Sequence, residues 1–269
     1  MTKIATIAGS DASGGAGLEA DLKTFAEYGI YGMAAVTLVA TMDPDNSWSH
    51  KVFPLSEDAL RAQLETIFKG VGVCAVKSGM LGSFFAVDLT KEYLKKHNID
   101  NYVLDPVMVC KGGGEPLNPE LNQAIAEKLL PLAQVVTPNI FEAEQLSGIS
   151  IENHEQVRTA ASIIHKKGAR HVLIKGPRLK GAERAIDFFY DGDKFELIES
   201  ELLTTSWTHG AGCTISAALC AGLAQGLSPL DAARRAKRFI STSLAHGFAL
   251  NRWVGPGNPS AWRNDKLFS

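Results

Sequence analysis

Thr208-His209-Gly210-Ala211-Gly212-Cys213-Thr214 is the stretch around which the chain is organised, and an alanine-rich run from Ile215 to Ala221 follows it directly. The two glycines let the backbone turn so that its N–H groups converge, and the helix behind them adds the positive end of its dipole. Such a turn predicts an anion-binding site, with phosphate as the expected anion. Cys213 lies at its mouth, where the pKa of the thiol is expected to be lowered. The alternative is an ordinary helix start with a buried, inert cysteine.

Short apolar runs and helical patterns alternate along the whole chain. Ser56 is the expected N-cap of a helix that ends at Gly70, and Ser228-Pro229 begins a long helix that ends near Gly247. Buried strands are expected at 3–9, 33–41, 73–77, 102–104, 134–137 and 171–175, and a hairpin at 185–190 and 194–199. This alternation, without a Pro-, Ser- or Gly-rich linker, predicts one α/β domain over residues 1–269 with a mostly parallel sheet. In such sheets ligands bind beyond the carboxyl ends of the strands.

The composition is that of an ordinary globular protein. The chain has 269 residues, of which 45% are hydrophobic and 21% charged, and its formal net charge is -2. This balance gives no reason to expect nucleic acid or an anionic membrane as a partner, and no apolar run is long enough to span a bilayer. Met1 leads straight into the first strand, without a signal-peptide pattern. The four cysteines (Cys74, Cys110, Cys213 and Cys220) lack CxxC spacing, which predicts reduced thiols and a cytoplasmic protein.

The first loop contains a second glycine motif. Gly15-Ala16-Gly17-Leu18-Glu19-Ala20 fits G-x-G-x-x-A, and Asp43 lies at the end of the next strand, so a dinucleotide-dependent oxidoreductase is one alternative. The motif is short and often accidental, and Gly15 lies several residues past the strand instead of in a tight turn. This alternative also leaves the glycine turn at Gly210 unexplained.

Polar residues follow the fourth and fifth of the expected parallel strands. Asp105, after one strand, can hold Mg²⁺, bind a substrate hydroxyl or only stabilise an Asp-Pro turn. The segment from Cys110 to Pro116, with three consecutive glycines, is expected to close over a ligand or to be a solvent loop. Glu142 and Glu144 follow the next strand. Glu142 in particular is expected to bind Mg²⁺, and ordinary helix N-terminal acids are the alternative.

Two further sites complete the candidate set. Lys175-Gly176 ends a strand where the lysine can meet a phosphate, and Asp187 is a weaker candidate for the border of an adenosine pocket. No P-loop motif occurs in the sequence. His209, four residues before Cys213, makes a thiol hydrolase another alternative, although a polar turn residue is the favoured interpretation of this histidine.

Six motifs in order resemble those of the ribokinase-like vitamin kinases, in the branch of hydroxymethylpyrimidine (phosphate) kinase and the similar bacterial pyridoxal kinases. They are GSDASGGAGLEADLKTF from Gly9, KSGMLGS from Lys77, DPVMVCKGG from Asp105, TPNIFEAEQL from Thr137, VLIKG from Val172 and THGAGCT from Thr208. The resemblance covers nearly the whole chain. It implies a three-layer α/β/α sandwich, Mg²⁺ with ATP as co-substrate, transfer of a phosphoryl group to a hydroxymethyl group, and a homodimer.

The resemblance also implies roles for individual residues. The expected catalytic residues are Gly210, Ala211, Gly212 and Cys213, which form the anion hole, together with Cys110. The expected nucleotide-binding residues are Asn139, Glu142, Lys175, Gly176, Asp187 and Gly212, and the expected metal ligands are Asp105 and Glu142. The substrate is expected to meet Gly9, Asp11, Gly17, Met42, Met80, Val107, Cys110 and Cys213.

The stretch after the second strand differs from that of the pyrimidine kinases, and the difference distinguishes between two vitamin substrates. The pyrimidine kinases usually carry Ala-Gln-Asn-Thr after the second strand, whereas this chain has Ala40-Thr41-Met42-Asp43-Pro44. Met42 cannot replace the hydrogen bonds of the glutamine, and a polar group left unpaired costs about 1–3 kcal/mol. A thioether can instead pack on a methylated pyridine ring. This stretch, with Asn46-Ser47-Trp48 and Cys110, favours pyridoxal over hydroxymethylpyrimidine as the substrate.

Two mechanisms for Cys213 remain open from sequence. As a thiolate it can take the proton of the attacking 5′-hydroxyl late in the reaction. Alternatively, its sulfur can add to the aldehyde of pyridoxal as a hemithioacetal, with Cys110 arriving as the segment from Cys110 to Pro116 closes. Three classes of function stay open from the sequence: a vitamin kinase, a dinucleotide-dependent oxidoreductase and a non-catalytic small-molecule binder.

Overall fold

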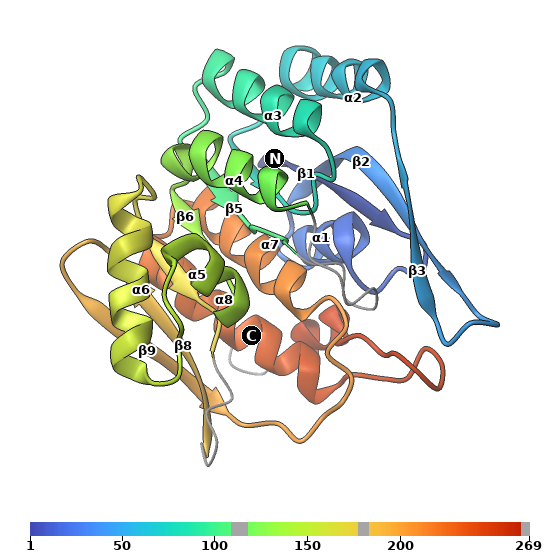
Figure 1. The fold of residues 1–269 in the computed structure, drawn as a ribbon. Helices are drawn as coiled ribbons and strands as arrows, with labels where there is room; N and C mark the ends of the chain where they lie inside the picture. The colour runs from blue at the N-terminus through green and yellow to red at the C-terminus, as the bar shows by residue number, and fades with distance from the viewer. Residues whose placement is uncertain (109–117, 177–182, 265–269) are drawn as a thin grey trace.

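The central sheet runs through the whole molecule (Figure 1). The computed structural model describes residues 1–108, 118–176 and 183–264. Within them one sheet has the strand order β3-β2-β1-β4-β5-β6-β7-β8-β9. Six neighbouring strands in this order, β2, β1, β4, β5, β6 and β7, are parallel. The antiparallel strand β3 lies at one edge, and the antiparallel strands β8 and β9 lie at the other. Their bounds are β1 Lys3–Asp11, β2 Tyr31–Asp43, β3 Ser49–Pro54, β4 Ala75–Ser78, β5 Asn101–Leu104, β6 Val135–Val136, β7 Val172–Ile174, β8 Arg184–Tyr190 and β9 Phe195–Glu201.

Helices cover both faces of this sheet, so the predicted three-layer α/β/α sandwich is confirmed. One face carries α2 (Glu57–Leu64), α3 (Phe84–Lys96), α4 (Pro119–Lys128), α5 (Ile140–Ser147) and α6 (His154–Lys166). The other face carries α1 (Gly17–Glu27), α7 (Ala211–Ala224) and α8 (Pro229–Ala245). Neighbouring strand residues point to opposite faces. On β5, for example, Val103 packs in the core of the α1, α7 and α8 layer and Leu104 in the core of the other layer.

Helix α7 is the helix that the glycine turn begins, and it lies deep in the fold. Every residue from Thr214 to Leu223 is buried. The sequence is made of small and apolar residues on all sides, as expected for a helix with no solvent face. The helix contacts β4 and β5 on the sheet and α1 and α8 on its flanks. The turn is therefore held rigidly above the carboxyl ends of the central strands.

The observed elements differ from the expected ones in three places. The antiparallel strand β3 was not predicted, because four of its six residues are exposed and its sequence lacks the apolar alternation of a buried strand. The strands β1 and β2 extend further than expected, up to Asp11 and Asp43. The helix expected to end at Gly70 is α2 followed by a π-helical segment, Glu65–Val71.

Two expectations from composition can be compared with the structure. Cys74, Cys213 and Cys220 are free cysteines, and Cys110 lies outside the described residues. Across the described ranges, none of the helices combines the length and the apolar character that crossing a bilayer requires.

Candidate active site

The loops at the carboxyl ends of the parallel strands enclose one large cavity. Its volume is about 970 Å³, the size of pockets that hold small-molecule ligands. All the described residues predicted for the site line it, and Cys110 lies outside the described part of the chain. These are Gly9, Asp11, Gly17, Met42, Met80, Asp105, Val107, Asn139, Glu142, Lys175, Gly176, Asp187, Gly210, Ala211, Gly212 and Cys213. Glu144 is instead engaged on the outside, where its Oε1 accepts the N–H of Ile151 at 2.8 Å.

The glycine turn has the backbone geometry of an anion site. Gly210 has φ of +72°, in the left-handed region, and a Cβ there would collide with the carbonyl oxygen of Gly15. Helix α7 begins at the next residue, and the N–H groups of a first helical turn have no partner within the helix. A Cβ on Gly212 would lie 3.3 Å from Nζ of Lys175, so the ammonium group of Lys175 is close to this turn. A cation and a helix N-terminus thus meet at one point.

Cys213 does not have the lowered thiol pKa that was predicted from its position. The residue is partly exposed and lines the cavity, yet protein surrounds its thiol, and this loss of hydration raises the thiol pKa to about 11. The ammonium of Lys77 and the N–H of Gly17, which donates to the sulfur, pull in the opposite direction, and Asp105 adds to the rise. The prediction was wrong because desolvation outweighs the helix N-terminus. With this pKa the thiol is expected to stay protonated at neutral pH.

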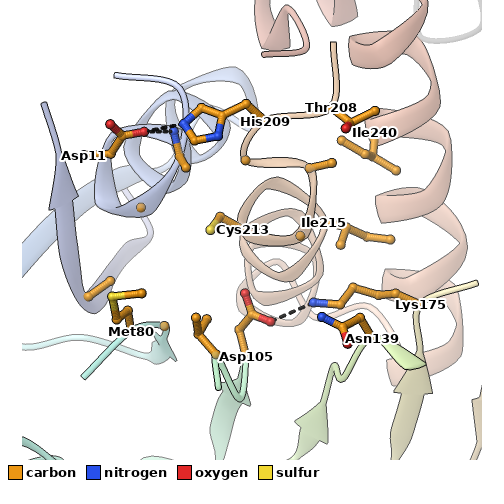
Figure 2. A pocket seen from close by; sticks show the side chains of 18 of the residues that line it. Asp11, Met80, Asp105, Asn139, Lys175, Thr208, His209, Cys213, Ile215 and Ile240 are labelled. Atoms are coloured by element: carbon orange, nitrogen blue, oxygen red, sulfur yellow. Dashed lines mark hydrogen bonds and ion pairs between the residues drawn. The ribbon is translucent and has the colours of Figure 1, made fainter. Parts of the chain in front are cut away.

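Lys175 forms an ion pair with Asp105 in the cavity (Figure 2). Its Nζ is 2.8 Å from Oδ1 of Asp105, and the two side chains are 15% and 2% exposed. Burial opposes the charge on Lys175, but the carboxylates of Asp105 and Glu142 outweigh it and raise the lysine pKa. Burial raises the pKa of Glu142 to about 7, with Asp105 adding to the rise and Lys175 opposing it. The lysine is therefore a fixed cation at the floor of the cavity.

Asn139 and Glu142 hold each other in place at the start of α5. Oδ1 of Asn139 accepts the N–H of Glu142 at 2.9 Å, and Oε2 of Glu142 accepts the N–H of Asn139 at 2.8 Å, which is a capping box. This reciprocal pair fixes a carboxyl group at the cavity edge. The local sequence produces this geometry, because Pro138 precedes the N-cap and stops the strand.

The donor set fits a magnesium ion that arrives with a nucleotide. In the described ranges no group of three or more His, Cys, Asp and Glu side chains is placed to hold a metal. Asp105 and Glu142 supply two carboxyl groups that both act electrostatically on Lys175. Mg²⁺ is commonly bound by one or two carboxylates together with phosphate oxygens and water. These residues therefore suit a metal–phosphate complex and not a metal held by protein alone.

A buried ion pair that the sequence did not predict stands at the far end of the cavity. Nζ of Lys237, on α8, lies 2.9 Å from Oδ2 of Asp187, and both side chains are almost fully buried. Oδ1 of Asp187 accepts the N–H of Gly176, where a Cβ would collide with the carbonyl oxygen of Ile186. Lys237 follows Ala236 on the buried face of its helix. That position was the available signal, since a lysine there needs a partner.

The structure also disfavours two of the alternative functions. Nε2 of His209 lies 2.7 Å from Oδ2 of Asp11, so the imidazole is engaged away from the Cys213 sulfur and the thiol hydrolase loses its base (Figure 2). A Cβ on Gly15 would lie 2.5 Å from the ring of His209. The ring fills the space beside the G-x-G-x-x-A turn where a dinucleotide pyrophosphate would need to approach.

Two more cavity residues escaped the sequence reasoning. Lys77 is the third residue of β4 and is fully buried, with Nζ 2.9 Å from Oδ2 of Asp21. His50 is on β3, the strand that was not predicted, and its register partner on β2 is Met42. Directly opposed residues of antiparallel strands point to the same side, so His50 and Met42 face the cavity together.

Comparison with known proteins agrees with this geometry. The family model of phosphomethylpyrimidine kinase matches residues 11–258. A putative pyridoxine kinase of Treponema pallidum is 55% identical over 98% of this chain and 99% of that protein, and the pyridoxine kinase of Bacillus subtilis is 50% identical over 98% and 97%. A hydroxymethylpyrimidine/phosphomethylpyrimidine kinase of Haemophilus influenzae is 38% identical over 97% and 98%.

Solved structures show the same relationship. The pyridoxal kinase of Bacillus subtilis in complex with ADP has a TM-score of 0.94 at 50% identity, covering 98% of this chain and 99% of that chain. The pyridoxal kinase of Staphylococcus aureus in complex with AMP-PCP and pyridoxal has a TM-score of 0.92 at 44% identity, covering 98% and 96%. The resemblance drawn from six sequence motifs is confirmed: the chain belongs to the phosphomethylpyrimidine kinase family.

Proposed function

We propose that this protein transfers the γ-phosphoryl group of ATP to the 5′-hydroxymethyl group of pyridoxal, and also of pyridoxine and pyridoxamine, in vitamin B6 salvage. The observation that carries the proposal is the meeting of Lys175, the glycine turn and Cys213 in one cavity, in a chain whose fold matches a pyridoxal kinase that binds AMP-PCP and pyridoxal. Phosphoryl transfer needs mainly positioning and support of charge, and these groups provide both.

The nucleotide occupies the half of the cavity between α5 and α8. The N–H groups from Gly210 to Cys213 and the ammonium of Lys175 hold the transferred phosphate. Asp105 and Glu142 would hold the Mg²⁺ that accompanies ATP, and the ion would neutralise phosphate charge. Asn139, Gly176 and Asp187 border the nucleotide beyond it, with Lys237 fixing Asp187.

The vitamin occupies the other half, between Gly9, Gly17 and the β2–β3 hairpin. Met42, Met80 and Val107 supply apolar contacts for a methylated pyridine ring, and Cys213 lies beside the acceptor hydroxyl. A thiol pKa of about 11 disfavours a free thiolate as the base. In the alternative step, sulfur bonds to the aldehyde carbon of pyridoxal and the thiol proton passes to the carbonyl oxygen. Cys110 stays a candidate partner for that step.

A second candidate is the phosphorylation of hydroxymethylpyrimidine or its phosphate, as named for the relative from Haemophilus influenzae. Met42 argues against it, since its thioether cannot pair with an aminopyrimidine. We also propose that residues 1–269 form a single domain, in line with the one sheet in the described ranges. We further propose a homodimer, for which the exposed Val52 and Phe53 of the edge strand β3 offer apolar surface, and a cytoplasmic location, in line with the free thiols.

The test is a steady-state ADP-release assay with pyridoxal, pyridoxine and hydroxymethylpyrimidine in parallel. We expect the highest kcat/KM with pyridoxal, and at least about a 100-fold loss of kcat in Lys175→Met, the size of effect seen when one donor to a developing anion is removed. Lys166→Met, at the exposed end of α6, is the matched control and should match the wild-type protein. A kcat/KM that is higher for hydroxymethylpyrimidine would replace the proposed substrate, and no ADP with any alcohol would remove the function.

A further inference from the structure

Asp11 and His209 are joined by a hydrogen bond at the rim of the cavity (Figure 2). Nε2 of His209 lies 2.7 Å from Oδ2 of Asp11, and the side chains are 12% and 6% exposed. Although burial raises it, hydrogen bonds from His209 and Ser13 lower the pKa of Asp11 to about 2, so the carboxylate only accepts and Nε2 donates. The N–H groups of Ser13 and Ala16 also donate to this carboxylate, each at 2.8 Å. Protein donors thus already occupy both oxygens of Asp11.

His209 is fixed equally firmly on its own side. Its backbone N–H donates to the carbonyl oxygen of Gly255 at 3.1 Å. Its ring packs on Gly15, where a Cβ would lie only 2.5 Å from Cδ2. The following residue, Gly210, packs on the carbonyl of Gly15 in the left-handed conformation. The pair therefore ties the loop between β1 and α1 to the turn that starts α7.

The starts of both helices meet at one atom. Helix α1 begins at Gly17 and helix α7 at Ala211, and the N–H of Gly17 donates to the sulfur of Cys213. Cys213 is the third residue of α7, so the sulfur faces two helix N-termini. Its surroundings depend on how the first turn of α1 sits against the first turn of α7.

We propose that Asp11 and His209 are a positioning pair, which holds the start of α1 against the start of α7 so that both face the Cys213 sulfur and the transferred phosphate. This role is additional to the substrate contact that the sequence predicts for Asp11, which also lines the cavity. His50 is the further titratable group whose charge is coupled to both residues. The proposal deepens the proposed function and rests on it for the effect on turnover, because a shift of about 1 Å in a reacting group can cost about 100-fold in rate.

The test compares His209→Phe, which removes the donor, with His209→Gln, whose amide can still donate to Asp11. The first readout is alkylation of Cys213 by iodoacetamide without substrates, followed by peptide mass spectrometry over a range of pH. Loss of the Gly17 contact raises the pKa of the sulfur, and one pKa unit lowers the rate at fixed pH about tenfold. We expect that loss in His209→Phe and Asp11→Asn, and most of the rate restored in His209→Gln.

The second readout is turnover with pyridoxal. We expect kcat to fall about 10- to 100-fold in His209→Phe with little change in the KM for ATP, since the nucleotide half of the cavity is untouched. His171→Phe is the control, because Nδ1 of His171 lies 2.9 Å from the carbonyl oxygen of Gln134 in a hydrogen bond remote from the cavity, and both readouts should stay at wild-type values.

Three results separate the possible failures. Alkylation of Cys213 at the wild-type rate or faster in His209→Phe would overturn the positioning role. If that variant does not fold, Asp11→Asn, which keeps the shape of the side chain, decides the same question. If the wild-type protein does not phosphorylate pyridoxal, the proposed function fails, and the alkylation comparison still tests the pair.

Discussion

The ion pair between Lys77 and Asp21 should be one of the most expensive contacts in the fold to break. Nζ of Lys77 lies 3.0 and 2.9 Å from the two oxygens of Asp21, and both side chains are completely buried. The hydroxyl of Thr6 donates to the same carboxylate at 2.6 Å. Removing one partner leaves the other charge without compensation, which costs about 3–5 kcal/mol. We predict that Lys77→Met lowers the free energy of unfolding by this amount.

The double variant Lys77→Met/Asp21→Asn separates the pair from its surroundings. Because it removes both charges, it should recover about 2–3 kcal/mol relative to the sum of the single variants. Arg61→Met is the control, since its 2.9 Å pair with Glu57 is about half exposed and screened by solvent, so its loss should change the free energy of unfolding little. Denaturant unfolding followed by tryptophan fluorescence is measured on the wild-type protein, the single variants Lys77→Met and Asp21→Asn, the double variant and Arg61→Met. If Lys77→Met costs no more than Arg61→Met, or the two buried substitutions are additive, the electrostatic argument is refuted.

Three further predictions concern the cavity. Asp11→Asn should lower the free energy of unfolding at pH 7 by about 1–2 kcal/mol, after a discount for partial solvent screening. Because the folded carboxyl pKa of about 2 lies below its ordinary 3.8, this difference between the two proteins is present above pH 3.8 and disappears as the pH falls through 2. Urea melts at a series of pH values measure it. Alkylation of Cys213 should keep accelerating from pH 7 towards pH 11, and a plateau near pH 8 would contradict the raised thiol pKa. Met42→Gln should shift the ratio of kcat/KM values towards hydroxymethylpyrimidine by about 5- to 150-fold, as one gained hydrogen-bonding group implies, and an unchanged ratio would remove Met42 as the selecting residue.

The parallel core and the glycine turn were predictable because both have local causes. Apolar runs such as Val172–Ile174 are buried on both faces. A parallel strand covered by helices on both sides needs such a continuous apolar run, so the run itself indicated the strand. Gly210 takes a left-handed conformation because helix α7 starts directly against the backbone of Gly15, and glycine adopts this conformation without a steric cost. The position of Asp105 and Lys175 at strand ends followed from the topology alone, since parallel strands end at one edge.

The remaining features depend on contacts between distant segments. Lys237 and Asp187 are fifty residues apart in sequence, and only the packing of α8 against the sheet brings them together. The same holds for Asp11 and His209, which are 198 residues apart in sequence. The thiol pKa of Cys213 was mispredicted because a motif shows the helix start but not how much protein surrounds the sulfur. The edge strand β3 has no buried face to mark it in the sequence.

The central claim is that this cavity moves a phosphoryl group from ATP to the hydroxymethyl group of pyridoxal. The most direct measurement is ³¹P NMR of the protein with magnesium, ATP and pyridoxal, with the product confirmed by mass spectrometry. The account predicts that ADP and pyridoxal 5′-phosphate appear in equal amounts and that no inorganic phosphate accumulates. ADP with inorganic phosphate and unchanged pyridoxal would contradict it.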